Sequence, residues 1–154
     1  MTLSVVGLGK KTCLAIVVVV CSVGLSCGIF SKTAVSPSEF SQDNWLSKAI
    51  TDSEKAGSDL VEAGNTNSGE AGLGIVAASR KDMPAAASAL ASAARQDAES
   101  VAKIIVAVDP ENSTSLGEVV LEAARKDASS MGVVVASAAR DDPRAAGKII
   151  SLVI

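Results

Sequence analysis

The sequence contains no histidine and no tyrosine, and its aromatic residues are one tryptophan and two phenylalanines among 154 residues. Without histidine the chain has no imidazole base, which excludes Ser-His-Asp and Cys-His catalysis and histidine-containing metal sites. A net charge of −3 together with so few aromatic rings argues against nucleic acid as a partner, because such binding needs a basic surface and stacking rings. The hydrophobic share of 48% excludes wholesale disorder.

Cysteine is absent after residue 27, so the rest of the chain cannot form an internal disulfide. The cysteines are Cys13, Cys21 and Cys27. Cys27 follows Val23-Gly24-Leu25-Ser26, which resembles the lipobox of bacterial lipoproteins, where a small residue precedes a lipidated cysteine. The segment departs from that pattern at Gly24, where leucine is usual, and Cys21 lacks the small preceding residue. The resemblance implies that Cys27 carries the lipid.

The first 30 residues differ in composition from the remainder. Lys10 and Lys11 precede an uncharged run, residues 12–31, that includes four consecutive valines. A positive segment before an apolar one is typical of an export signal or a membrane-spanning helix, with the residues that follow outside the cytoplasm. Three alternatives stay open: a lipoprotein signal, an uncleaved hydrophobic anchor helix, or a cleaved signal peptide. The polar residues 31–44 are expected to be a tether between the membrane and a domain in the cell envelope.

The remainder of the chain repeats itself every fifteen residues. Asp82, Asp97, Asp127 and Asp142 lie on one ladder of that spacing, and Asn112 occupies its missing rung. We call each fifteen-residue segment a row and count places within it from one to fifteen. The rows are 53–67, 68–82, 83–97, 98–112, 113–127, 128–142 and the incomplete 143–154.

Four places in the rows carry a defined kind of residue. The fifth is always glycine or alanine, the eighth is always a large aliphatic residue, and the fifteenth is aspartate or asparagine in every complete row. The thirteenth is arginine in four rows, namely Arg80, Arg95, Arg125 and Arg140. An alanine-rich chain produces chance alanine matches, but these columns together indicate a true repeat.

Each row is interpreted as one short helix. An Asp or Asn at the end of a row is a preferred N-cap for the next helix, and places four, eight and eleven form an apolar stripe. Pro84, Pro110 and Pro143 all fall in the turn zone, which argues against one continuous helix in a right-handed coiled coil. We therefore predict an all-α fold over residues 45–154: a solenoid of short antiparallel helices joined by turns of two or three residues.

The small fifth residue predicts close packing between helices. Glycine inside a helix costs up to ~1 kcal/mol relative to alanine, and a close backbone approach would offset this cost. Replacing Gly117 or Gly132 by leucine is therefore expected to lower the melting temperature through overpacking.

The turn Asp142–Ala146, with the pattern Asp-Pro-x-x-Ala-Ala, resembles turns of HEAT-like repeats and of the N-terminal superhelical domain of MgtE-type magnesium transporters. The acidic residues typical of the MgtE domain are missing here. The resemblance is architectural, and it implies a binding or scaffold role without carrying over any functional residue.

Two interpretations of the arginine column remain open. The arginines either stabilise helix C-termini and pair with the aspartate two residues later, or they form an anionic partner's binding surface. If the chain reverses at every row, Arg95 shares an edge with Arg125, and Arg80 with Arg140. The glycines of residues 69–74 lack the order and the preceding strand of a phosphate loop, so no nucleotide site is expected there.

The repeat accounts for most charged residues and leaves no cluster of titratable groups, so we expect no enzyme, cofactor or metal site. The apolar residues 149–154 predict packing on a partner or a second copy, or continuation of a longer array. The predicted function is a structural or protein-interaction module tethered to the membrane. The alternative is a sensor or accessory subunit that binds a small ligand or cation between helices. The turn Asp109–Asn112, which departs from the repeat, is where a specific function is expected.

Overall fold

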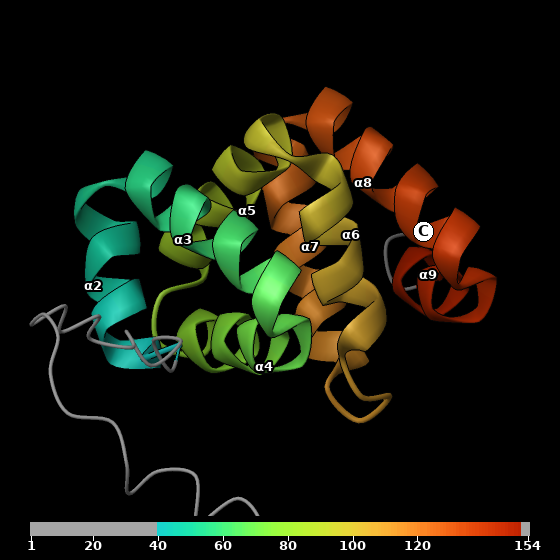
Figure 1. Ribbon diagram of the computed structural model, residues 1–154, viewed down its shortest axis with the longest axis horizontal. Helices are drawn as coiled ribbons and strands as arrows, with labels where there is room; N and C mark the ends of the chain where they lie inside the picture. Colours follow the sequence, from blue (N-terminus) through green and yellow to red (C-terminus); the bar gives the residue numbers. More distant parts are fainter. Residues whose placement is uncertain (1–39, 152–154) are drawn as a thin grey trace, which may run out of the picture. The chain divides into compact units, whose positions relative to one another are not determined.

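The computed structural model describes residues 40–151, and these residues form eight α-helices and no strand (Figure 1). The predicted all-α class is confirmed. The predicted N-terminal hydrophobic helix, the segment 1–30 and Cys27 lie outside the described residues. The helices are α2 (Gln42–Thr51), α3 (Ser53–Thr66), α4 (Ser68–Ser79), α5 (Met83–Gln96), α6 (Ala98–Ala107), α7 (Ser113–Lys126), α8 (Ala128–Asp141) and α9 (Pro143–Ile150).

The helix starts follow the sequence rows. Helices α3 to α9 begin at residues 53, 68, 83, 98, 113, 128 and 143, which are the first residues of the seven rows. Pro84 and Pro143 lie in the first turns of α5 and α9, where a missing N–H group costs little.

Asp52, which lies fifteen residues before Asn67, ends one helix and caps the next. The backbone N–H of Asp52 donates to the carbonyl oxygen of Lys48 at 2.6 Å and so completes α2. The Asp52 carboxylate accepts from the backbone N–H of Lys55 at 3.0 Å and so caps α3. A backbone with φ −152° and ψ 87° at Asp52 separates the two helices. The same single-residue join recurs at Asn67, Asp97, Asp127 and Asp142.

These joins are shorter than the two or three turn residues that we expected, because the cap residue itself ends one helix and begins the next. A side-by-side antiparallel pair of helices needs a loop of about 2–5 residues. The helices on either side of a single-residue join therefore meet at a corner. The most extensive packing is instead between alternate helices, α3 with α5, α5 with α7 and α6 with α8.

The predicted caps hold at six of the seven ladder residues and fail at Asn112. Asn112 has φ −97° and ψ −3°, a helical conformation in which its side chain makes no capping hydrogen bond. Its N–H donates to the carbonyl oxygen of Asp109 at 3.0 Å, because Asp109–Asn112 forms a turn of its own. The join between α6 and α7 is accordingly longer, spanning residues 108–112.

The core is formed by the apolar stripe at places four, eight and eleven. The fourth place is fully or almost fully buried in all seven rows, from Ala56 to Ala146. The eighth place is buried from Leu60 to Val120, whereas Val135 in α8 is only partly buried. The stripe was predicted from its spacing. The exception at Val135 shows that the core is less well buried at the C-terminal end of the described helices.

The aromatic residues Phe40 and Trp45 close the N-terminal end of the described helices. The indole Nε1 of Trp45 donates to the carbonyl oxygen of Ala56 at 2.9 Å, and Trp45 is 2% exposed. The Phe40 ring lies 5.6 Å from the Trp45 ring and contacts the place where Gly74 lacks a side chain. Helix α2 begins at Gln42, so its first residues lie inside the segment 31–44 that was predicted to be a tether.

Candidate functional site

The fifth-place glycines of α3 and α4 lie against neighbouring helices. A Cβ atom on Gly57 would stand 2.8 Å from the backbone nitrogen of Ala93 in α5. A Cβ atom on Gly72 would collide with the side chain of Val108, which follows α6. The predicted close approach of a neighbouring backbone explains Gly57, whereas at Gly72 it is a side chain that occupies the space.

The same explanation fails at the fifth-place glycines of α8 and α9. A Cβ atom on Gly132 or Gly147 would meet no atom within 4 Å among the described residues. The expected overpacking by leucine at Gly132 is therefore wrong for this chain in isolation, because an added side chain there enters open space. Gly117 in α7 is buried, in contrast to Gly132.

Gly132 lies on the floor of an apolar groove of about 260 Å³ at the C-terminal end of the fold. Helices α7, α8 and α9, which form the groove, also contact one another (Figure 1). Every side chain that lines it is apolar or absent. We call it the C-terminal groove, defined by Val120, Leu121, Ala124, Ala128, Met131, Gly132, Val135 and Ile149.

Two members of the arginine column lie close to this end of the molecule. The guanidinium of Arg95 at the end of α5 lies 3.7 Å from the carboxylate of Asp127, which caps α8. Arg125 at the end of α7 pairs with Glu122 of its own helix at 2.9 Å and is 68% exposed. The predicted pairing with an aspartate therefore occurs for Arg95, but with the cap of a later helix instead of the aspartate two residues on.

The other two arginines lie on different surfaces. Arg80 is exposed at the C-cap of α4, and Arg140 donates to the hydroxyl of Ser137 in its own helix at 3.0 Å. Helix α5 packs on α7, so Arg95 and Arg125 are on neighbouring helices. Helix α4 packs on α2, α3, α5, α6 and α7, and α8 on α5, α6, α7 and α9, so the shared edge expected for Arg80 and Arg140 is not formed.

The cap residues of α6 and α8 are two of the acidic groups whose pKa is lowered. Hydrogen bonds from the hydroxyl and the backbone N–H of Ser100 lower the pKa of Asp97. The backbone N–H and the hydroxyl of Ser130 lower the pKa of Asp127 in the same way, and Arg95 adds to the effect. Each carboxylate is therefore held in its ionised form by the helix that it caps.

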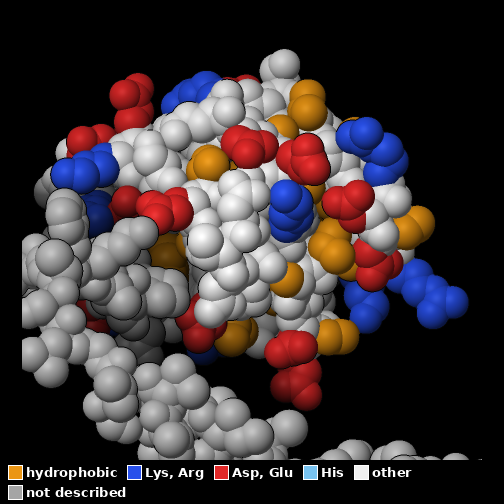
Figure 2. Space-filling view, in the orientation of Figure 1, with side chains coloured by type: hydrophobic (Ala, Val, Ile, Leu, Met, Phe, Trp, Pro, Cys, Tyr) orange, Lys and Arg blue, Asp and Glu red, His pale blue; other side chains and the backbone are white. Residues whose placement is uncertain are grey.

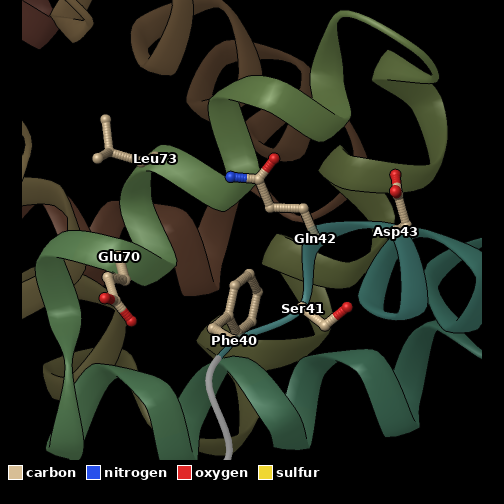
Figure 3. A pocket seen from close by; sticks show the side chains of 6 residues that line it. All are labelled: Phe40, Ser41, Gln42, Asp43, Glu70 and Leu73. Carbon is tan, nitrogen blue, oxygen red and sulfur yellow. The ribbon is translucent and has the colours of Figure 1, made fainter.

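A second hollow, of about 470 Å³, lies at the opposite end of the helix series and is partly polar. Figure 3 shows Glu70 and Leu73 of α4 beside Phe40, Gln42 and Asp43 at the start of α2. The Asp43 carboxylate accepts from Lys81 Nζ at 2.6 Å, and this hydrogen bond and charge lower the pKa of Asp43. The carboxylate already has a cation as its partner.

The surface offers no other concentrated chemistry in the part of the chain that the structure describes. Acidic and basic side chains alternate over the face seen in Figure 2, with isolated hydrophobic ones between them. Residues 40–151 hold no group of three or more acidic or cysteine side chains placed to bind a metal ion. The helices within that range include none with the length and apolar character needed to span a membrane.

Comparison of the chain with protein-family models, with curated proteins and with solved structures gives no match. The resemblance to HEAT-like and MgtE-like repeats therefore stays a prediction. The sequence predicted a partner surface at residues 149–154, which include Ile149 of the C-terminal groove, but it did not identify the part of the groove formed by α7 and α8. Its residues occupy the same places as buried residues of earlier rows, so no sequence signal distinguishes Gly132 from Gly72.

Proposed function

We propose that this chain is a non-enzymatic, exported, membrane-tethered helical-repeat protein that serves as a structural or protein-interaction module. The regular helix starts support a repeat array, since seven helices begin at intervals of one row. Arrays of this kind present extended surfaces to partners and need terminal faces that are capped or covered. The contact surface proposed for the partner includes α9, the apolar C-terminal helix.

The observation that carries the proposal is the apolar C-terminal groove beside Gly132. Its eight lining residues include no charged or hydrogen-bonding side chain, so it suits an apolar protein surface better than a polar metabolite. Val135, which would be core at this place in any earlier row, remains partly exposed there.

The sensor alternative would use the polar hollow near Phe40. A cation there would have to displace Lys81 from the Asp43 carboxylate, and Glu70 comes from a different helix. The geometry therefore favours the interaction module over a ligand sensor.

The test of an interaction role is site-directed photocrosslinking of the full chain in its own envelope. A photoreactive amino acid at Leu121, on the rim of the groove, should form one discrete protein adduct. The same amino acid at Glu62, exposed on α3, is the matched control and should form none. Adducts at Glu62 alone, or at neither site, would contradict an interaction role for the groove.

The membrane tether is tested separately at Cys27. Metabolic labelling with a fatty-acid analogue should label the full chain, and Cys27→Ala should abolish the label if the lipoprotein alternative holds. A label that persists in the Cys27→Ala variant, or an unlabelled chain that washes out of the membrane fraction with salt, would contradict lipid tethering at this residue.

A further inference from the structure

The described helices follow one packing order. Each helix contacts the helix three places before it: α5 contacts α2, α6 contacts α3, α7 contacts α4, α8 contacts α5, and α9 contacts α6. Contacts with the helix two places before accompany these in every case. A helix placed next in this order would contact α7, α8 and α9, which are the helices that line the C-terminal groove.

The groove residues have counterparts in earlier rows, and those counterparts are buried. Two rows before Val120, Met131 and Val135 stand Leu90, Val101 and Ile105, each at most 3% exposed, on helices that α8 packs against. Four rows before them stand Leu60, Ala71 and Ile75, all fully buried, on helices that α6 packs against. The chain thus covers this surface twice with its own helix. In the third instance Val120 and Met131 are still buried, at 2% and 1% exposed, whereas Val135 is only partly buried and Gly132 is exposed.

The contacts of α6 with Gly64 and Gly72 show which side chains a covering helix places in this space. A Cβ atom on Gly64 would meet the carbonyl oxygen of Ser100 and the side chain of Ile104, and one on Gly72 would meet Ile104 and Val108. Helix α6 therefore presents Ser100 and Ile104 at i and i+4, and Val108, directly after the helix, adds a second branched aliphatic side chain. Gly132, which corresponds to Gly72, leaves the same space for an incoming branched side chain.

The position of Arg125 indicates where the N-terminus of the incoming helix would lie. Arg95, at the thirteenth place of α5, lies 3.7 Å from Asp127, the N-cap of the helix that covers α5 and α6. Arg125 holds the same place on α7, is exposed, and bonds only within its own helix among the described residues. An acidic N-cap on the incoming helix would meet Arg125 in the way that Asp127 meets Arg95.

We infer that the C-terminal groove binds a single amphipathic helix of a partner protein, with a branched aliphatic residue that packs on Gly132 and an acidic N-cap that pairs with Arg125. This inference rests on the proposed interaction function and specifies the chemistry of the partner.

A second copy of the chain is a poorer occupant than a partner helix. Every described helix of a folded copy already packs its apolar face on at least two others. The large hydrophobic side chains that remain exposed among residues 40–151 are Ile50, Leu73 and Val133, one on each of three helices. Each of these side chains stands alone on its helix, so together they form no apolar stripe that could fill the groove.

The probe is a synthetic helix with the sequence of residues 127–142, because α8 fills the equivalent surface inside the fold. It is stapled between positions 129 and 133, which are exposed in α8, and carries a fluorophore at its C-terminus. Fluorescence anisotropy with the full chain in mild detergent should show saturable binding. The control peptide carries Val134→Asp, at a position that is fully buried in α8, and should bind at least tenfold more weakly.

Two matched variants of the full chain locate the binding. Gly132→Leu fills the groove floor and should weaken binding at least tenfold, whereas Gly147→Leu adds the same side chain at another open glycine outside the groove and should leave binding unchanged. Circular dichroism should show both variants folded. Arg125→Glu should weaken binding about threefold to tenfold, and an Asp127→Asn peptide should lose most of that sensitivity.

The outcomes separate this inference from the proposed function. Equal binding by the Gly132→Leu and Gly147→Leu variants, or no binding of the stapled helix, overturns the inference. If the photocrosslinked partner at Leu121 is still captured in that case, the interaction function stands without it. If the full chain alone sediments as a dimer that Gly132→Leu dissociates, the occupant is a second copy and the partner helix is wrong.

Discussion

Gly72 in α4 and Gly132 in α8 both occupy the fifth place of their rows, yet their surroundings differ. Gly72 is buried against Ile104 and Val108, whereas Gly132 faces open space. The difference does not come from the helices that carry them. It comes from whether a later helix of the described chain covers them. A glycine at the fifth place is therefore a packing position that is filled from two helices later, as α6 fills the space at Gly72 of α4.

The comparison extends to the aliphatic column. Leu60, Ile75 and Leu90 are fully buried at the eighth place, but Val135 is only partly buried at the same place in α8. The eighth-place side chains of the N-terminal rows are thus fully buried, whereas that of α8 is partly exposed to solvent. The predictions below test that contrast, beginning with the largest effect.

Leu90→Ala should lower the free energy of unfolding by about 3–4 kcal/mol, because a fully buried leucine leaves a cavity that its neighbours fill only in part. Val135→Ala at the same place in α8 should lower it by about 1 kcal/mol or less, because part of that side chain is already in water. Urea denaturation followed by circular dichroism measures both. Equal losses would show that α8 is as well covered as α5.

Gly57→Leu should destabilise the chain by about 2–3 kcal/mol, because the new side chain meets the backbone of α5. Gly132→Leu should be neutral or stabilise the chain by up to about 1 kcal/mol, since leucine favours helix and the site is open. The same denaturation curves provide the measurement. A loss at Gly132 similar to that at Gly57 would mean that the groove is filled in the free protein.

Asp97→Ala should cost about 1–2 kcal/mol, because the Asp97 carboxylate accepts from the backbone N–H groups of Glu99 and Ser100. Asn112→Ala is the matched control and should cost a few tenths of a kcal/mol at most, because Asn112 makes no side-chain cap bond. A cost at Asn112 comparable to that at Asp97 would contradict the different geometry of the Asp109–Asn112 turn.

Stability should fall slightly as the pH drops below 4. The pKa values of Asp97 and Asp127 are lowered by folding, so their stabilisation is complete above the unfolded value of about 3.9 and is lost as the pH falls through the folded values. In the Asp127→Asn variant the melting temperature should fall less between about pH 5 and about pH 2, which is the window set by these lowered pKa values. An unchanged pH profile in that variant would show that Ser130 does not hold the carboxylate.

The row starts and the core stripe could be predicted because each depends on a few residues at fixed spacing. A cap residue such as Asp82 and an apolar place such as Leu90 act within one helix or on its nearest neighbours. The single-residue joins were not predicted, because the aspartate was expected to start one helix and instead also completes the helix before it. Asn112 was not distinguished from the other caps, since its conformation depends on the turn that Pro110 begins.

The groove could not be predicted because its residues obey the repeat. Gly132 and Val135 satisfy the same columns as core residues, and only the absence of a covering helix among residues 40–151 leaves Gly132 exposed and Val135 partly exposed. The arginine column was recognised, but its pairing crosses from α5 to the cap of α8, which sequence spacing alone does not indicate.

The most direct test of this account is a set of nuclear Overhauser effects on the full chain, with and without the stapled helix of residues 127–142. The account predicts contacts of the Ile104 methyl groups with the Hα atoms of Gly64 and Gly72 in the free chain. Contacts of the peptide's Val134 methyl groups with the Hα atoms of Gly132 should appear only when the peptide is added. Peptide contacts near Phe40, or a Gly132 already in contact with another side chain in the free chain, would contradict it.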